Sequence, residues 1–467
     1  MNVCIIGDGL TSLSLAKNLI NKKINVHIYH QKKINDLNSS RTIGISSNNF
    51  KFINKNIIKI SKKNAWKIKK IEIYSENLKN DKILNFENKK NELFFMVKNQ
   101  EFYKLLNMNL LKNKFFKKII IKKDNFYEKI IKEKKYNLII NCDANNPLSK
   151  KYFSKKIDKD YNSLAYTTIL EHKKLDNDTA IQVFTKSGPI AFLPVSNKET
   201  SIVCSLDIKN KEYSDNDVLN LIKKNNPKFK IKKFFKLNNF KLKSSSSRNY
   251  YYENILGFGD SLHRIHPLAG QGFNMTIRDI KTLSDIIQNK VDLGMQLDNS
   301  IFEEFQKKTK GQAYTCNLAS KFIGKDDIIT YGACDYFYKF NIKKYDKMIN
   351  ESDLIVFVHK PKKKNIVNFK EYGWIKKGTN NSIQSIKCKN KVSNNPKKDF
   401  VIIGSFTFKN KEIFTNSFKK MVKKKDKINS EYYMDIMIKH AIKLKYKVKY
   451  ISVNNFKSFG TPRDLTE

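Results

Sequence analysis

A glycine-rich turn near the N-terminus holds the first residues whose types and spacing could do chemistry. The tract Gly7-Asp8-Gly9-Leu10-Thr11-Ser12 follows the apolar run VCII and precedes a stretch with helical spacing. Glycine at position 7 permits a tight turn, and glycine at position 9 lets backbone N–H groups approach a pyrophosphate. The N-terminus of the following helix adds partial positive charge. An ordinary strand-to-helix turn is the alternative interpretation. The residues predicted to bind dinucleotide phosphates are Gly7, Gly9, Leu10, Thr11 and Ser12.

A histidine stands at the end of the second predicted strand, INVHIYH. In dinucleotide-binding βαβ units this position usually carries an acidic residue that bonds the adenosine ribose. The neutral imidazole of His30 can accept a hydroxyl hydrogen bond through one nitrogen, so ribose binding is compatible with the substitution. A plain surface histidine is an equally good interpretation.

A second set of spaced glycines and polar residues spans residues 257–279, GFGDSLHRIHPLAGQGFNMTIRD. It resembles the second FAD motif of the flavin-dependent aromatic hydroxylases, most closely those of ubiquinone biosynthesis. The resemblance implies that Asp260 holds the ribityl chain or the pyrophosphate. It also implies that backbone N–H groups at a helix N-terminus face the flavin edge, where a reduced flavin carries negative charge. The residues concerned are Pro267, Gly270, Gln271, Gly272 and Asn274.

Three further tracts extend this resemblance. The segment RTIGIS resembles an arginine-containing flavin-contact segment, which makes Arg41 a cofactor candidate. The segment GPIAFLP, residues 188–194, resembles the strand beside the flavin. Cys142-Asp143-Ala144 keeps the aspartate of the family's Ala-Asp-Gly tract, so Asp143 is also a candidate. The glycine of that tract is missing, which leaves the local backbone geometry open.

The elements that must position these residues follow an α/β order. The runs VCIIG, LTSLSLAKNLI and INVHIYH predict a βαβ unit with parallel strands. Strand-like runs between about residues 60 and 250 predict a mixed second sheet, and ILGFGD then leads into a helix over 272–287. The predicted fold is a Rossmann-like FAD-binding domain with an inserted mixed-sheet substrate domain, together covering residues 1–325.

The chain from about Ile328 onward resembles a different family, the sugar-phosphate nucleotidyltransferases. The tracts that carry the resemblance are CDYFYKF, EYGWIKKG, FVIIGSFTF, SEYYMD and SFGTPRDL. The resemblance implies that Asp335 and Asp435 bind the Mg²⁺ that bridges nucleotide and sugar phosphates. Residues 326–467 lack the glycine-rich loop that opens that fold, so we expect transferase catalysis to be missing and treat both aspartates as inert relics. We predict a truncated α/β domain whose open sheet edge pairs with the flavin domain or another chain.

Composition and charge exclude several classes of protein. The formal charge is +47, yet only five of the 91 basic residues are arginine, which leaves 86 lysines spread through the chain. Specific nucleic-acid recognition favours arginine, so we attribute the charge to biased composition, with weak attraction to anionic lipid as an alternative. Six widely spaced cysteines argue against disulfides and structural zinc. With no long apolar segment, we expect a cytoplasmic protein, or one peripheral to the inner face of the membrane.

The leading hypothesis is an FAD-dependent monooxygenase that uses NAD(P)H and O₂ to hydroxylate a small aromatic substrate. The resemblance implies that the substrate carries a phenolic ring, as a polyprenylated ubiquinone precursor does. No catalytic base can be named, since His263 and His266 could equally brace the cofactor loop. Two alternatives stay open. One is a nucleotidyltransferase that needs Mg²⁺ and a partner supplying the missing loop, and the other is an inactive fusion whose C-terminal part only binds or oligomerises.

Overall fold

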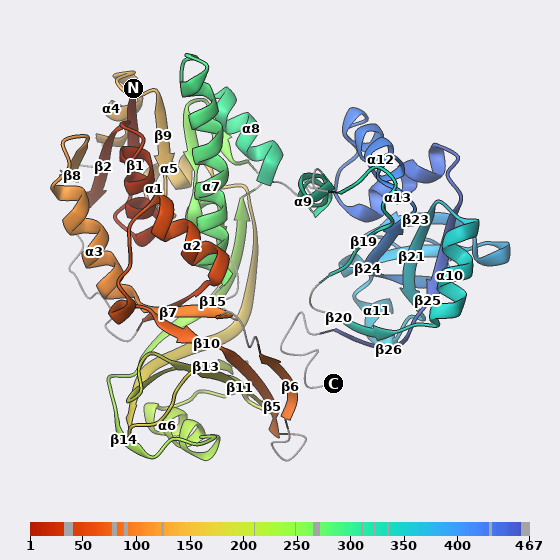
Figure 1. Ribbon diagram of the computed structural model, residues 1–467, viewed down its shortest axis with the longest axis horizontal. Helices are drawn as coiled ribbons and strands as arrows, with labels where there is room; N and C mark the ends of the chain where they lie inside the picture. The colour runs from red at the N-terminus through yellow and green to blue at the C-terminus, as the bar shows by residue number, and fades with distance from the viewer. Residues whose placement is uncertain are drawn as a thin grey trace. The chain divides into compact units, whose positions relative to one another are not determined.

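The computed structural model divides the chain into two compact units, Met1–Gln306 and Lys307–Leu465 (Figure 1). The structure describes residues 1–31, 41–76, 82–87, 92–122, 126–209, 211–247, 249–264, 271–309, 312–320, 323–333, 336–428 and 432–458. The division falls earlier than the predicted boundary at residues 325/326. The reason is packing: Ala313 and Cys316 of helix α9 (Gln312–Ala319) contribute to the core of the second unit.

The first unit is built around a six-stranded sheet in the order β16-β17-β9-β1-β2-β8. The strands from β17 to β8 all pair in parallel, which confirms the predicted βαβ start. Four of the five residues of β1 are buried, as expected for a parallel strand covered on both faces. The strands are β1 (Asn2–Ile6), β2 (Asn25–Gln31), β8 (Phe116–Ile121), β9 (Leu138–Asn141), β16 (Tyr251–Tyr252) and β17 (Ile255–Gly257).

Helices cover both faces of this sheet because its strands alternate buried side chains between two cores. Val3 and Ile5 of β1 join the core formed with α1, α3, α7 and α8. Cys4 and Ile6 face the opposite core, formed with α4 and α5. The helices are α1 (Leu10–Ile20), α2 (Ser47–Asn56), α3 (Asn99–Leu111), α4 (Phe126–Lys132), α5 (Pro147–Tyr152), α7 (Gln271–Asp292) and α8 (Ser300–Thr309).

A nine-stranded mixed sheet follows in the lower part of the same unit (Figure 1). Its order is β18-β15-β10-β13-β12-β11-β5-β6, with β14 pairing β10, and helix α6 (Asp215–Lys224) packs on it through Val218 and Ile222. A small sheet, β3-β7-β4, completes the unit. The strands are β3 (Thr42–Ser46), β4 (Trp66–Ile68), β5 (Lys70–Ser75), β6 (Lys82–Glu87), β7 (Phe94–Lys98), β10 (Lys156–His172), β11 (Thr179–Thr185), β12 (Gly188–Pro194), β13 (Glu199–Asp207), β14 (Ile231–Phe234), β15 (Asn238–Ser247) and β18 (His263–Arg264).

The second unit has its own α/β core around a sheet ordered β23-β22-β24-β21-β25, with β19 also pairing β24. The predicted strand FVIIGSFTF is β24 itself, whereas the predicted helix SEYYMDIMIKHAIKL begins only at Met434. The elements are β19 (Ile329–Tyr331), β20 (Tyr336–Lys339), β21 (Leu354–His359), β22 (Gly373–Lys377), β23 (Ile383–Cys388), β24 (Phe400–Phe408), β25 (Val448–Ser452), β26 (Asn454–Ser458), α10 (Ile342–Glu351), α11 (Lys363–Val367), α12 (Lys411–Lys423) and α13 (Met434–Lys443).

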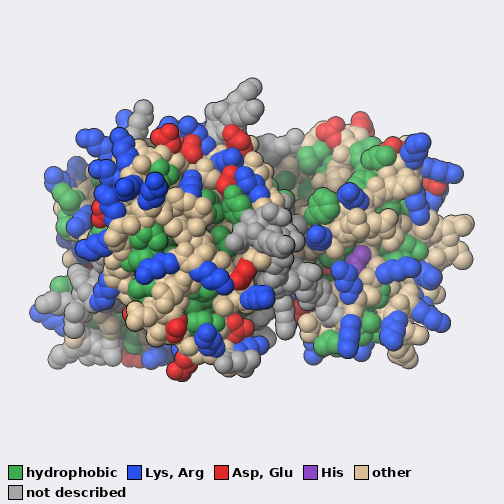
Figure 2. Space-filling model, turned by 90° about the horizontal axis from the view of Figure 1, so that it is seen from below, with side chains coloured by type: hydrophobic (Ala, Val, Ile, Leu, Met, Phe, Trp, Pro, Cys, Tyr) green, Lys and Arg blue, Asp and Glu red, His purple; other side chains and the backbone are tan. Residues whose placement is uncertain are grey.

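The surface agrees with the diffuse charge seen in the sequence. Figure 2 shows Lys and Arg side chains scattered among polar and apolar ones over the face in view, on both units. Within the described part of the chain, no helix combines the length and the apolar composition needed to cross a bilayer.

Asp279 lies on the side of α7 that faces the core, and the residue is 8% exposed. Burial raises its pKa to about 7, and the adjacent Arg278 opposes this only in part. Because the folded pKa exceeds the ordinary value of 3.8, the proton is bound more tightly in the folded chain, and stability is lost as pH rises between about 4 and 7. We therefore expect Asp279→Asn to raise the free energy of unfolding by about 2–4 kcal/mol at pH 8. Urea unfolding at pH 8 and pH 4 checks this, since an equal effect at both pH values would contradict it.

Candidate functional site

The carboxyl ends of three neighbouring parallel strands bring the predicted cofactor residues to one edge of the six-stranded sheet. Gly7 follows β1, Asp143 follows β9 and Asp260 follows β17, and these strands are adjacent in the order β17-β9-β1. Ligands of open parallel sheets bind outside this edge. The topology therefore joins segments that lie more than 100 residues apart in the sequence.

The turn after β1 has the geometry that a phosphate cradle requires. Gly7 has φ +114°, a region that favours glycine, and a Cβ on it would lie 3.3 Å from Ser12 Oγ and 3.4 Å from the Asp143 backbone nitrogen. A Cβ on Gly9, in contrast, would meet no described protein atom within 4 Å. Helix α1 has no side-chain cap and no acidic residue in its first turn. The orphan N–H groups of this turn thus lie beside open space, which suits a phosphate.

The short 3₁₀ turn Gly259–Ser261 packs directly on the start of α1. Gly259 has φ +60°, and a Cβ there would lie only 2.6 Å from Thr11 Cγ2, so a larger residue would push the two segments apart. The neighbouring Asp260 is exposed at this edge. The two motifs recognised in the sequence therefore meet in the fold through Thr11 and Gly259.

An open pocket of about 460 Å³ adjoins the same edge and reaches the long strands β10 and β15. Its lining mixes charges of both signs, and Lys243 forms an ion pair with Asp160 at 3.2 Å. The lining residues are Ala144, Asn145, Lys156, Asp158, Asp160, Lys243, Ser244, Ser245, Asp260 and Arg264. The pocket thus connects the cofactor edge to the nine-stranded sheet.

Asp143 is held by a polar network beneath the edge. Its side chain accepts a hydrogen bond from the Asn145 backbone at 2.9 Å, while its carbonyl accepts one from Ser149 Oγ at 2.6 Å. Buried Asn141 in turn bonds Ser149 and Asn146. Ala144 is not among the residues with positive φ. The backbone here is therefore accessible to alanine, and loss of the glycine needs no strained turn.

Asn274 near the start of α7 fixes the segment that follows Arg41. Its amide nitrogen donates to the Gly44 carbonyl at 2.7 Å, and its amide oxygen accepts from the Ser46 backbone N–H at 2.9 Å. Asn49 donates a further bond to the same oxygen. The cofactor contact of Asn274 stays a prediction, whereas its side chain has a structural task that sequence reasoning missed.

Arg41 precedes β3 at an exposed position and lies against the nine-stranded sheet. Its guanidinium carbon is 5.7 Å from the centre of the Phe240 ring on β15. The Arg41 carbonyl accepts a hydrogen bond from Asn99 at the start of α3. The side chain therefore lies over an aromatic ring of the nine-stranded sheet.

A charged cluster around Asp8 also escaped the sequence analysis. The carboxylate lies between the two glycines, forms an ion pair with Lys118 Nζ at 2.9 Å and accepts a hydrogen bond from Tyr103 Oη at 2.9 Å. His30 Nδ1 lies 3.7 Å from it. Burial, reinforced by the Asp8 charge, raises the pKa of Tyr103. The sequence offered one clue to this cluster. Asp8 stands between two glycines that we expect to bind phosphates, and a carboxylate beside phosphates needs a cationic partner.

Comparison with known proteins agrees with this geometry. Residues 154–291 match the family model described as FAD binding domain. The ubiquinone biosynthesis monooxygenase COQ6, mitochondrial, of Dictyostelium discoideum is 29% identical over 224 residues, which is 36% of this chain and 45% of that protein. The chain is thus similar to an FAD binding domain and to a protein named as a monooxygenase. The 3-demethoxyubiquinol 3-hydroxylase of Escherichia coli is 30% identical over 128 residues, 25% of this chain and 31% of that protein. The chain spans less than half the length of these curated relatives.

Solved structures share the fold of the first unit. The probable FAD-dependent monooxygenase PqsL of Pseudomonas aeruginosa aligns with a TM-score of 0.53 at 12% identity, covering 68% of this chain and 93% of that one. The p-nitrophenol 4-monooxygenase PnpA of Pseudomonas putida aligns with a TM-score of 0.52 at 11% identity, covering 68% and 88%. At such identities the likeness concerns the fold alone.

Some predicted site residues lie outside the residues that the structure describes. These are Pro267, Gly270 and Asp335, and of Gln271 only the backbone at the start of α7 is described. His263 is described and packs its ring edge-on against Tyr250, with Nδ1 3.2 Å from Ser246 Oγ. This contact fits a bracing role.

Asp435, the second predicted Mg²⁺ ligand, lies at the start of α13 and contacts β22. A Cβ on Gly373 would overlap its carboxylate, which shows how closely strand and helix approach. Burial raises the pKa of Asp435 to about 6, opposed by a hydrogen bond from Cys388 and the charge of Lys389. The described residues contain no cluster of three His, Cys, Asp or Glu side chains placed to hold a metal. The Mg²⁺ site and the nucleotidyltransferase resemblance stay predictions.

Proposed function

We propose that the chain is an FAD-dependent monooxygenase that hydroxylates a phenolic ring with NAD(P)H and O₂. The observation that carries the proposal is the convergence of the uncapped α1 turn, Asp143 and Asp260 at one sheet edge. A polyprenylated ubiquinone precursor is the proposed substrate class, because two curated relatives are named for ubiquinone chemistry. The donor set fits FAD: N–H groups beside open space suit a pyrophosphate, and carboxylates suit sugar and ribityl hydroxyls.

Each group of residues has a distinct task in this proposal. Backbone N–H groups of residues 10–12 bind the pyrophosphate, while Asp143 and Asp260 accept hydrogen bonds from hydroxyl groups. FAD, when bound, supplies the electron transfer and oxygen activation that protein side chains cannot provide. The chain itself has to orient the aromatic ring and exclude water, which raises the strength of electrostatic interactions in the site.

Strand β12 is suited to forming an apolar wall for the ring. Ile190 and Phe192 point into the core under α6, so the intervening side chains Ala191 and Leu193 lie on the other face of the strand. Leu193 there packs against the small apolar cluster that includes Met96 and Ile68. An apolar face at this position favours an aromatic, lipophilic substrate over a charged sugar.

Purified full-length chain tests the proposal. We expect a yellow protein with flavin absorbance, whose oxidation of NADPH becomes faster when a phenol is added and yields a product one oxygen atom heavier. Parallel assays with NADH identify the preferred donor. A protein that stays colourless and cannot be reconstituted with FAD would refute the proposal, and flavin binding without phenol-stimulated turnover would reject the phenolic substrate class.

A further inference from the structure

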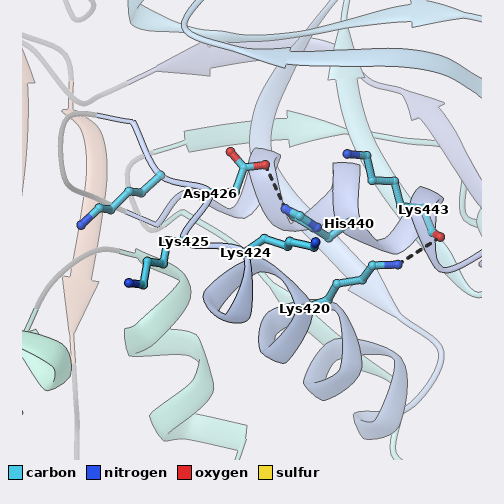
Figure 3. A pocket seen from close by; sticks show the side chains of 7 residues that line it. Lys420, Lys424, Lys425, Asp426, His440 and Lys443 are labelled. Carbon is cyan, nitrogen blue, oxygen red and sulfur yellow. Dashed lines mark hydrogen bonds and ion pairs between the residues drawn. The ribbon is translucent and has the colours of Figure 1, made fainter.

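A second polar pocket lies wholly within the second unit, where the C-terminal ends of α12 and α13 meet. Its volume is about 460 Å³. Figure 3 shows side chains from both helices and from the segment after α12 directed around it. Lys420 Nζ donates to the Lys443 carbonyl at 3.2 Å, which ties the two helix ends together.

A buried histidine forms part of the pocket lining. The side chain of His440 is 2% exposed, and its Nε2 lies 2.9 Å from Asp426 Oδ2. The same carboxylate oxygen accepts a hydrogen bond from Lys439 at 3.0 Å. The other ring nitrogen, Nδ1, is buried and has no hydrogen-bond partner in the part of the chain that the structure describes. The buried ring and its paired carboxylate therefore hold the segment after α12 against α13 beside the pocket.

The charge around the pocket exceeds what the fold itself requires. Five lysines line it, Lys420, Lys424, Lys425, Lys427 and Lys443, and none of them has an ion pair among the described residues, since Asp426 pairs with Lys439 and His440. Two helix C-termini contribute about −0.5 charge each and Lys439 balances Asp426, so roughly one lysine suffices for neutrality. About four positive charges are therefore available to an anion.

We propose that this pocket binds the phosphate group of a phosphate monoester or diphosphate, held by the surrounding lysines. Lysine ammonium groups bind phosphate as point charges. The same headgroup chemistry occurs in soluble phosphate esters and in anionic phospholipids, and the two sources are separable by experiment.

Titration of the full-length chain with inorganic pyrophosphate, followed by calorimetry in about 0.1 M salt, tests the site. We expect saturable binding with a Kd below about 1 mM. The double substitution Lys424→Met with Lys443→Met should weaken it about tenfold or more. The matched control is Lys423→Met, an exposed residue of α12 outside the pocket, which should change nothing.

A second arm uses phosphatidylcholine vesicles that contain phosphatidic acid. Sedimentation with these vesicles, lost in the double lysine variant but retained in Lys423→Met, would assign the phosphate to a lipid headgroup. Far-UV circular dichroism confirms that each variant is folded. The proposal is overturned if neither pyrophosphate up to about 10 mM nor the vesicles bind, or if Lys423→Met weakens binding as much as the pocket variants, because the attraction would then be diffuse.

Discussion

Replacing Gly9 with aspartate is expected to lower the affinity for FAD at least about 100-fold while leaving the fold intact. A Cβ at this position meets no described protein atom within 4 Å, so the side chain has room. Gly9 is the N-cap of α1, and aspartate there would accept bonds from the same N–H groups that we assign to the pyrophosphate. The FAD-free variant should be a few tenths of a kcal/mol more stable than the wild type. Flavin fluorescence titration and thermal unfolding measure the two effects.

The matched comparison is Gly7→Val, two residues earlier in the same turn but with a different physical basis. Gly7 has φ +114°, and a Cβ on it would lie 3.3 Å from Ser12 Oγ and 3.4 Å from the Asp143 backbone nitrogen. Valine there should lower the free energy of unfolding by about 2 kcal/mol or more, and FAD binding with it. If Gly9→Asp destabilised the FAD-free chain as strongly as Gly7→Val, loss of FAD would no longer identify a phosphate site.

Replacing Lys118 with methionine should be the second most damaging change. The substitution leaves the Asp8 carboxylate without its cation beside the expected phosphates, and the pair is mostly buried, with side-chain exposures of 15% for Lys118 and 23% for Asp8. Repulsion between two charges about 5 Å apart at a protein surface costs about 3 kcal/mol, so FAD affinity should fall about 10- to 100-fold. Stability should fall by about 1–3 kcal/mol. Equilibrium dialysis with FAD and urea unfolding provide the measurements.

A double-mutant cycle separates this explanation from its alternative. Asp8→Asn removes the negative charge, so it should preserve or improve FAD affinity, and it should rescue most of the loss in Lys118→Met. If Asp8 instead bonded the adenosine ribose directly, Asp8→Asn alone would weaken FAD binding and would not rescue the lysine variant.

Local patterns in the sequence predicted the elements well where one physical cause dominates. The run LTSLSLAKNLI became α1 residue for residue, because its apolar positions repeat at helical spacing, and FVIIGSFTF became β24 because it is a short run rich in aromatic and β-branched residues. The parallel pairing of β1 and β2 could be predicted because a helix connects the two strands, as in a βαβ unit. The glycine-rich turn was readable for the same reason, since its glycines stand where strand passes to helix.

Contacts between distant residues were not readable in this way. The Asp8 cluster joins a turn to Tyr103 on α3 and Lys118 on β8, more than 90 residues away, and nothing in the local pattern of either element indicates the pairing. The bonds from Asn274 to β3 span more than 220 residues. The boundary predicted at residues 325/326 was taken from the point where a sequence resemblance faded. The structural division falls earlier, at Gln306/Lys307, because Ala313 and Cys316 of α9 pack into the core of the second unit.

Hydrogen–deuterium exchange with and without FAD tests the central claim most directly, namely that two distant segments bind one dinucleotide at a single sheet edge. We predict one FAD per chain and simultaneous protection of peptides covering residues 7–12 and residues 257–275, with both effects lost in Gly9→Asp. Binding of FAD that protects only one of these segments, or neither, would contradict the account, as would a chain that binds no FAD at all.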